Sequence, residues 1–134
     1  MTELAAAQSG SMVADTAPNA PANASFDLVL RAVAGSALGS SGARYALTIS
    51  AIDLTAVKQG WPTQTLHQAF DAAHGWKRSG TGPDYQCVQI FPVPVPGGGP
   101  GGPLTGHTLQ CVASLVSQGA QIASIIHSPP FVLL

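Results

Sequence analysis

Three segments of the chain alternate between apolar and polar residues with a period of two. The clearest is 107–117, where the apolar positions are Leu109, Cys111, Ala113 and Leu115. Segments 25–35 and 44–56 alternate in the same way, with Phe26 and Tyr45 as their first large apolar residues. Successive side chains of a β-strand point to opposite faces, so this spacing predicts strands that bury one face.

Turn-forming residues separate the alternating segments. The connection 35–43, GSALGSSGA, is rich in glycine and serine, and we expect it to join 25–35 and 44–56 as a β-hairpin. The β-branched and aromatic residues in 85–93 predict another strand there. Because proline has no amide hydrogen for a ladder, Pro92 and Pro94 predict that this strand ends along a sheet edge.

Further extended pieces lie near the end of the chain, at 122–126 and 131–134, after a QGAQ turn at 118–121. Five to seven short strands with Gly/Pro turns and one helix predict an all-β fold, an antiparallel β-sandwich. Immunoglobulin-like connections are one form of it, and a small barrel is the alternative.

The chain is long enough for one domain, with 134 residues. Residues 1–24 hold almost nothing large to bury, so ordering them would cost more backbone entropy than their contacts return. We therefore predict a flexible N-terminal arm over 1–24 and a single sandwich domain over 25–134.

The segment WPTQTLHQAFDAAHGW, 61–76, is the helical candidate. The apolar residues that recur at one-turn spacing are Leu66, Phe70 and Ala73. Thr63 or Thr65 would cap this helix and Gly75 would end it.

Three potential metal ligands would share one face of that helix: His67, Asp71 and His74, at positions i, i+4 and i+7. Two imidazoles and a carboxylate can bind zinc. An amphipathic helix places polar residues on one flank in any case, so a solvated face is the favoured explanation for the three. We predict no metal and no other cofactor, and keep these three as the weak candidates.

The run PVPVPGGGPGGPLTG, 92–106, formally contains a G-x-G-x-x-G motif in Gly97, Gly99 and Gly102. That motif binds a pyrophosphate only where a helix N-terminus follows at once. Here Pro103 and LTGHT follow, without a helical pattern. We expect a long strand connection instead of a nucleotide site.

Cys87 and Cys111 lie in predicted strands among apolar neighbours, where a thiol is usually a small buried hydrophobe. We expect both to be reduced. A disulfide across the Pro/Gly connection is the alternative, and it requires the two strands to pair. No local signature of a nucleophile, such as G-x-S-x-G, is present, and we predict no catalytic residue.

Charged residues make up only 8% of the chain, with five Lys and Arg against six Asp and Glu. Ordinary soluble domains have about 25%. The balance leaves no basic face for nucleic acid or anionic lipid. No apolar stretch reaches the roughly 18 residues of a membrane-spanning helix. No export signal is visible, which makes the cytoplasm the default compartment.

So few charges leave the outer strand faces to Thr, Ser, Gln, Ala and Val. Monomeric proteins usually avoid wide uncharged β surfaces, because such surfaces associate with a neighbour. We therefore predict a non-enzymatic structural or interaction subunit that self-associates into a homo-oligomer or larger assembly.

Two alternative functions stay open. A small-molecule-binding protein or cofactor-free enzyme would enclose an apolar pocket whose rim is drawn from His67, His74, Asp53 and Asp84. The other polar candidates for such a cleft are Arg31, Arg44, His107 and His127, and an Asp/His pair among all these residues could perform acid–base chemistry.

A carbohydrate-binding module would instead use exposed aromatic rings. The candidates for ligand or partner contact are Trp61, Trp76 and Tyr85. Anchoring the core is the other use of these rings.

Overall fold

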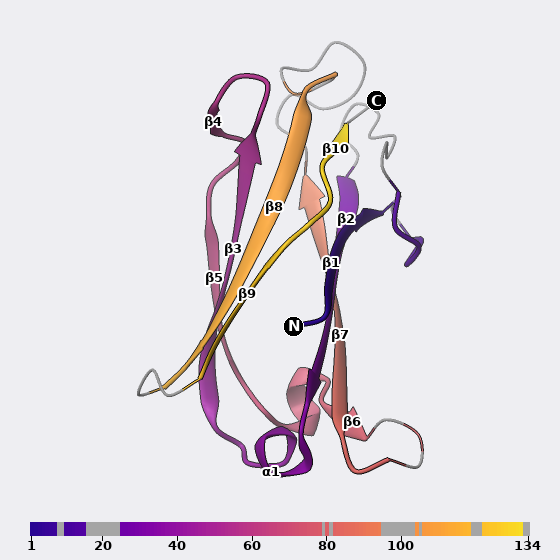
Figure 1. Cartoon of the computed structure of the whole chain (residues 1–134), viewed down its shortest axis with the longest axis vertical. Coiled ribbons are helices and arrows are strands. Elements are labelled where there is room, and N and C mark those ends of the chain that lie inside the picture. The colour runs from indigo at the N-terminus through magenta and orange to yellow at the C-terminus, as the bar shows by residue number, and fades with distance from the viewer. Residues whose placement is uncertain are drawn as a thin grey trace.

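The computed structural model describes residues 1–7, 10–15, 25–78, 80, 82–94, 104, 106–118 and 122–132. Its strands form two antiparallel sheets that pack against each other (Figure 1). The predicted all-β sandwich is thus confirmed. Among the described residues no strand pairing joins the two sheets, so they do not close into a barrel.

The first sheet, called sheet A, has the strand order β1-β2-β7-β6. Its strands are β1 (Glu3–Ala7), β2 (Ser25–Ala34), β7 (Tyr85–Pro94) and β6 (Lys77–Arg78). The two long strands, β2 and β7, pair over their full length from Ser25↔Pro94 to Ala34↔Tyr85.

The second sheet, called sheet B, is built on β3 (Arg44–Asp53) and β8 (Thr108–Ser117), which pair with each other. The outer side of β3 pairs with β4 (Lys58–Gln59) and β5 (Gln64–Ala69). The outer side of β8 pairs with β9 (Ala123–His127) and β10 (Phe131–Val132). Two single-turn helices, α1 (Ser36–Gly39) and η1 (Ala72–His74), lie in the connections.

The core lies between the sheets and is filled by alternate residues of the long strands. From β2 it takes Phe26, Leu28, Leu30, Ala32 and Ala34; from β3, Tyr45, Leu47, Ile49 and Ala51; from β8, Leu109, Cys111, Ala113 and Leu115. These are the positions that the alternation places on one face. The Phe26 ring contacts the rings of Trp61 and Phe131, with centroids 5.7 and 5.4 Å apart.

The predicted hairpin of 25–35 with 44–56 is wrong. These segments are strands β2 and β3, and they lie in opposite sheets. The connection between them contains α1 and crosses from one sheet to the other (Figure 1). Alternation shows only that each strand buries one face. Two such strands can pair as a hairpin in one sheet or face each other across the core, and the pattern is the same in both cases.

The predicted helix over 63–75 is also wrong, since Gln64–Ala69 forms strand β5 beside β3. Leu66 and Phe70 are four residues apart, and residues with this separation share a side in a strand as they do in a helix. Only Ala72–His74 is helical, capped by the Asp71 carboxylate, which accepts a bond from the His74 amide. Gly75 ends this turn as predicted, with φ 88°.

The N-terminal arm needs a correction as well. Glu3–Ala7 forms β1 along β2, and Leu4, Ala5, Ala6 and Ala7 are buried. The sandwich supplies a ladder and an apolar surface that an isolated segment lacks, which repays the ordering entropy. Residues 8–9 and 16–24 of the predicted arm lie outside the described residues.

The Pro/Gly run connects β7 to β8, as predicted, and its residues 95–103 and 105, with Gly97, Gly99 and Gly102, lie outside the described residues. Pro92 and Pro94 pair with β2 on one side, and β6 covers β7 only at Tyr85 and Gln86. The proline end of β7 therefore forms an edge of sheet A within the described chain. Residues 119–121 of the predicted QGAQ turn, and 133–134, also lie outside it.

The two cysteines lie in opposite sheets, Cys87 in β7 and Cys111 in β8, and both are buried free thiols. Because their strands do not pair, the condition for the predicted disulfide alternative is not met. Burial raises the pKa of the Cys111 thiol to about 12, so this side chain is a packing group and not a nucleophile.

We expect Gly39→Ala to destabilise the fold, whereas Gly35→Ala in the same connection should be tolerated. A Cβ at Gly39 would lie less than 3.0 Å from three atoms of the Tyr85 side chain, including its own Cβ, which cannot move without the backbone of β7. Such overpacking costs about 1–3 kcal/mol or more. Urea unfolding of Gly35→Ala, which meets nothing within 4 Å, is the control and should change by less than about 1 kcal/mol. Equal stability of the two variants would contradict this packing.

Candidate functional site

The outer face of sheet B carries almost no charge. We define it by the outward residues of four strands: Thr65, His67 and Ala69 of β5; Arg44, Ala46, Thr48, Ser50 and Ile52 of β3; Thr108, Gln110, Val112, Ser114 and Val116 of β8; Ala123, Ile125 and His127 of β9. The register aligns them in cross-strand rows, such as Thr65, Thr48, Ser114 and Ile125.

The only Asp, Glu, Lys or Arg on this face is Arg44, which lies at its end. Three large apolar side chains are exposed on it, Ile52, Val116 and Ile125, with 40%, 39% and 67% of their surface accessible. The expectation that outer strands carry Thr, Ser, Gln, Ala and Val is confirmed for sheet B, with isoleucine and histidine added.

The outer face of sheet A is treated differently, because the chain covers part of it with its own residues. Gly10 donates its amide hydrogen to the Asp27 carboxylate at 3.0 Å, and the Arg31 side chain donates to the Met12 carbonyl at 3.5 Å. Asp27 and Arg31 point outward from β2, so segment 10–15 (indigo in Figure 1) passes over this face. Arg31 also pairs with Glu3 at 3.7 Å, while Val33, Val88 and Ile90 remain exposed on this sheet. Sheet A therefore differs from sheet B in carrying an ion pair and a covering segment.

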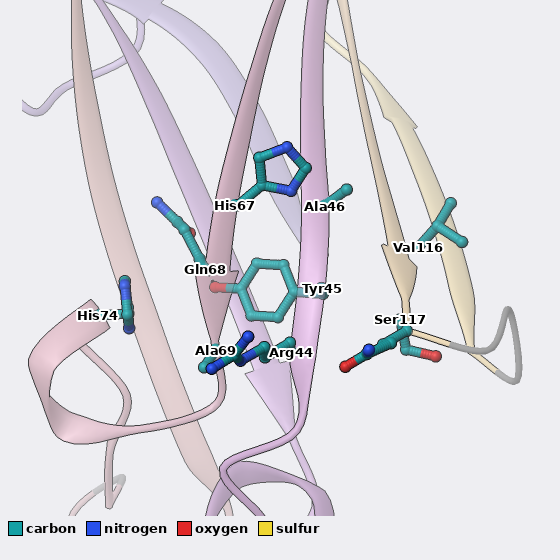
Figure 2. A pocket seen from close by; sticks show the side chains of 10 residues that line it. Arg44, Tyr45, Ala46, His67, Gln68, Ala69, His74, Val116 and Ser117 are labelled. Carbon is teal, nitrogen blue, oxygen red and sulfur yellow. Dashed lines mark hydrogen bonds between the residues drawn. The ribbon is translucent and has the colours of Figure 1, made fainter.

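A cleft of about 620 Å³ lies at one end of sheet B, where β3 begins and β5 and β8 end. Its walls are formed by Arg44, Tyr45, Ala46, His67, Gln68, Ala69, His74, Val116, Ser117 and Gln118. Arg44 is paired with Ala69 across the two strands, and His67 stands beside Ala46 (Figure 2). His74 reaches the cleft from η1.

The polar groups of the cleft are basic or neutral. Arg44 supplies a permanent positive charge, and His67 and His74 supply two imidazoles. His74 Nδ1 lies 2.7 Å from Asp71 Oδ1, so a neutral His74 donates from Nδ1 and keeps Nε2 as an acceptor. The bond from the His74 side chain holds the pKa of Asp71 below its ordinary value, against a smaller opposing effect of desolvation.

A buried hydrogen-bond network fixes the wall behind the cleft. Trp76 Nε1 donates to Tyr45 Oη at 3.1 Å, and Tyr45 donates to Gln68 Oε1 at 2.8 Å. The amides of Gln68 and Gln89 then bond to each other at 3.0 and 2.7 Å. Burial raises the pKa of Tyr45, which keeps its hydroxyl protonated as the donor in this network. The cleft wall is therefore held by bonds between both sheets.

A second Asp/His pair lies at the far end of β3. Asp53 is fully buried, and its Oδ2 lies 2.7 Å from His107 Nδ1. Its Oδ1 accepts the amide hydrogens of Thr55 and Ala56 at 3.0 Å. Burial would raise the pKa of Asp53, but the bonds from His107, Ala56 and Thr55 outweigh it and lower the pKa. Through these bonds Asp53 links the turn after β3 to His107, the residue just before β8.

The structure brings together only some of the predicted site residues. His67 and His74 line the cleft, with Asp71 behind His74, but His67 stands on β5 and not on a shared helical face. Within the described ranges no group of three or more His, Cys, Asp or Glu side chains is placed to hold a metal ion. Asp53 and Asp84 do not line the cleft. Sequence reasoning missed Gln68 and Gln118, since nothing in the local pattern marks them.

The three aromatic candidates pack against other side chains and do not form an exposed aromatic surface. Trp61 and Trp76 are buried, with rings against Phe26 and Phe70 respectively. Tyr85 is half-buried, with the Arg78 guanidinium carbon 5.9 Å from its ring centroid. The exposed indole platform that a sugar-binding module would need is not formed, and core anchoring is the observed use.

No helix in the described part of the chain has the length and apolar character needed to span a lipid bilayer. Comparisons with protein-family models, with curated proteins and with solved structures found no match. The function is therefore inferred from the geometry and composition of the outer face of sheet B and of the cleft at its end.

Proposed function

We propose that the protein is a non-enzymatic structural or interaction subunit that self-associates into a homo-oligomer, with a second copy of the chain covering the outer face of sheet B. The observation that carries this proposal is that Arg44, at one end, is the only Asp, Glu, Lys or Arg on the outer face of these four strands. The chain covers part of sheet A with its own segment 10–15 and supports it with an ion pair.

The physical argument is the low cost of removing this face from water. Burying an unpaired charge costs several kcal/mol, and Arg44, at the end of the face, is the only Asp, Glu, Lys or Arg on it. Ile125 and Val116 supply exposed apolar area, and hydroxyls such as Thr48 can bond across an interface. A net charge of −1 gives little repulsion between copies.

The area of the outer face limits how tightly two copies of the chain can associate. Four strands about 4.8 Å apart, with ten residues in the longest, present roughly 500–600 Å² of face. A standard interface removes about 800 Å² from each partner. The face is smaller than that, so we expect weak association, at micromolar concentrations or above.

Immunoglobulin-like connections form part of this proposal. The order β1-β2-β7-β6 opposite β9-β8-β3-β5 supports them, because it corresponds to an A-B-E-D sheet opposite a G-F-C sheet with one added C′ strand. In that arrangement the outer face of sheet B is the face of the G-F-C sheet.

The experiment is sedimentation velocity on the wild type and on Thr48→Lys/Ile125→Lys, which places two charges in one cross-strand row outside the cleft. We expect the wild type to exceed the monomer mass of 13.5 kDa at high micromolar concentration and the variant to remain a monomer. Val33→Lys, at an exposed position of sheet A, should associate like the wild type. A monomeric wild type, or equal association of all three, would overturn the proposal.

A small-molecule-binding protein is the second candidate, and the cleft favours it. Its volume of about 620 Å³ falls within the roughly 300–1,000 Å³ of ligand pockets. A few polar groups converge on walls of Ala46, Ala69 and Val116. This arrangement suits recognition of a small organic ligand.

A further inference from the structure

We propose that the cleft of sheet B binds a small organic carboxylate, whose carboxylate group pairs with Arg44 and whose apolar body lies against Ala46, Ala69 and Val116. This inference rests on the second proposed function, the ligand cleft. Its walls Ala46, Ala69 and Val116 also belong to the outer face of sheet B, so a ligand and a second copy of the chain would compete for this end of the face. It assigns a ligand class to a cavity from the charges and shapes of the side chains around it.

The first step concerns Arg44. Of the arginines in the described chain, Arg31 pairs with Glu3 and Arg78 lies over the ring of Tyr85. Arg44 is exposed at the start of β3, lines the cleft, and forms no ion pair within the described residues. Its guanidinium is therefore available to an anion from solution.

The second step concerns the remaining charges. No Asp or Glu lines the cleft. The nearest acidic group along the chain is Asp71, whose carboxylate is already bonded to the His74 ring at 2.7 Å and to the His74 amide at 3.0 Å. The electrostatic preference of the cleft is thus for an anion, with Arg44 as its permanent charge.

The third step separates a carboxylate from an inorganic anion. A guanidinium matches a carboxylate with two parallel N–H···O bonds, which adds geometric selectivity to charge. Beside it the walls are short apolar side chains, Ala46, Ala69 and Val116, that leave room for a hydrocarbon body. Phosphate or sulfate would use Arg44 but leave this apolar surface uncovered.

The fourth step concerns preorganisation. Tyr45 and Gln68, on neighbouring strands, are bonded to each other and to Trp76 and Gln89. These bonds hold the wall in place without a ligand, so binding need not order it. A preorganised site loses less affinity to conformational entropy.

The experiment titrates the whole chain with 2-naphthoate and follows backbone amide shifts by NMR. The neutral analogue 2-naphthalenemethanol and inorganic phosphate are titrated in parallel. We expect naphthoate to shift the amides of 44–46, 67–69 and 116–118, and the alcohol to bind at least about tenfold more weakly, since a hydrogen bond to a charged group contributes about that factor or more.

The decisive variant is Arg44→Gln, which should weaken naphthoate binding at least about tenfold. Arg78→Gln, at an arginine outside the cleft, should bind naphthoate like the wild type. Equal affinity of Arg44→Gln and wild type overturns the proposal, as does phosphate binding at these residues more tightly than naphthoate. Sedimentation of the same samples reports self-association separately.

The outcomes also distinguish this inference from the cleft proposal on which it rests. If the alcohol binds at these residues as tightly as naphthoate, the carboxylate assignment fails and the ligand cleft stands. If none of the three probes shifts an amide of the cleft walls, both proposals fail.

Discussion

Asp53→Ala is expected to lower the free energy of unfolding by about 3–5 kcal/mol, because it removes a buried carboxylate and leaves several hydrogen-bond donors unpaired. Asp53 is fully buried and accepts bonds from the Thr55 and Ala56 amides and from His107. Alanine leaves these donors without a partner and opens a cavity at the end of β3. Chemical denaturation monitored by tryptophan fluorescence measures the change.

The control is Asp84→Ala, at an exposed aspartate just before β7, which should change stability by less than about 0.5 kcal/mol. Asp53→Asn separates charge from hydrogen bonding, because its amide oxygen can still accept from the turn. We expect it to lie between Asp53→Ala and the wild type. A loss below about 1 kcal/mol for Asp53→Ala would contradict the role assigned to this carboxylate.

The Asp53 carboxylate also determines the direction in which the stability of the fold changes with pH. The pKa of folded Asp53 lies below its ordinary value of 3.8. The unfolded chain therefore takes up a proton first, and the contribution of Asp53 is fully present above pH 5 or so and lost as the pH falls through the folded pKa. Urea unfolding from pH 6 downward should show this loss in the wild type and a shallower one in Asp53→Asn.

Phe26→Ala is the second large effect, with an expected loss of about 3–5 kcal/mol. The Phe26 side chain is fully buried and packs against the rings of Trp61 and Phe131 at 5.7 and 5.4 Å. Phe26 lies in sheet A, Phe131 in sheet B and Trp61 in the connection between β4 and β5, so the cavity would open between the layers. Equilibrium urea unfolding measures the loss.

The matched control is Phe91→Ala, on the neighbouring strand β7 opposite Leu28. Phe91 is only half-buried against the core, and its loss should cost clearly less than that of Phe26. Equal costs would show that the ring cluster around Phe26 is not a centre of the core.

The fold class was predictable because the alternation is a local property. Leu109, Cys111 and Leu115 can share a face only in an extended chain that buries one side, and the structure places them in the core. Pro92 and Pro94 likewise predicted the edge of β7, since a missing amide hydrogen is a property of the residue itself. Gly75 was recognisable as a helix end for the same kind of reason.

Strand pairing could not be predicted in the same way. Residues 25–35 and 44–56 have the pattern of a hairpin and of two facing strands, and only the contacts of β2 with β1 and β7 distinguish them. Leu66 and Phe70 fit helix and strand equally. The missing information lies in distant partners, which local periodicity does not contain.

The candidate site was likewise predictable from the sequence only in part. The low charge content by itself determined that some outer strand face would carry almost no charge, and alternation determined which residues would lie on outer faces. Only the tertiary structure decided that this face is sheet B, that segment 10–15 covers part of sheet A, and that Arg44 meets His67 and His74 in one cleft. The physical reason is that facing direction follows from the backbone's two-residue repeat, whereas proximity between residues far apart along the chain exists only after the sheets have packed.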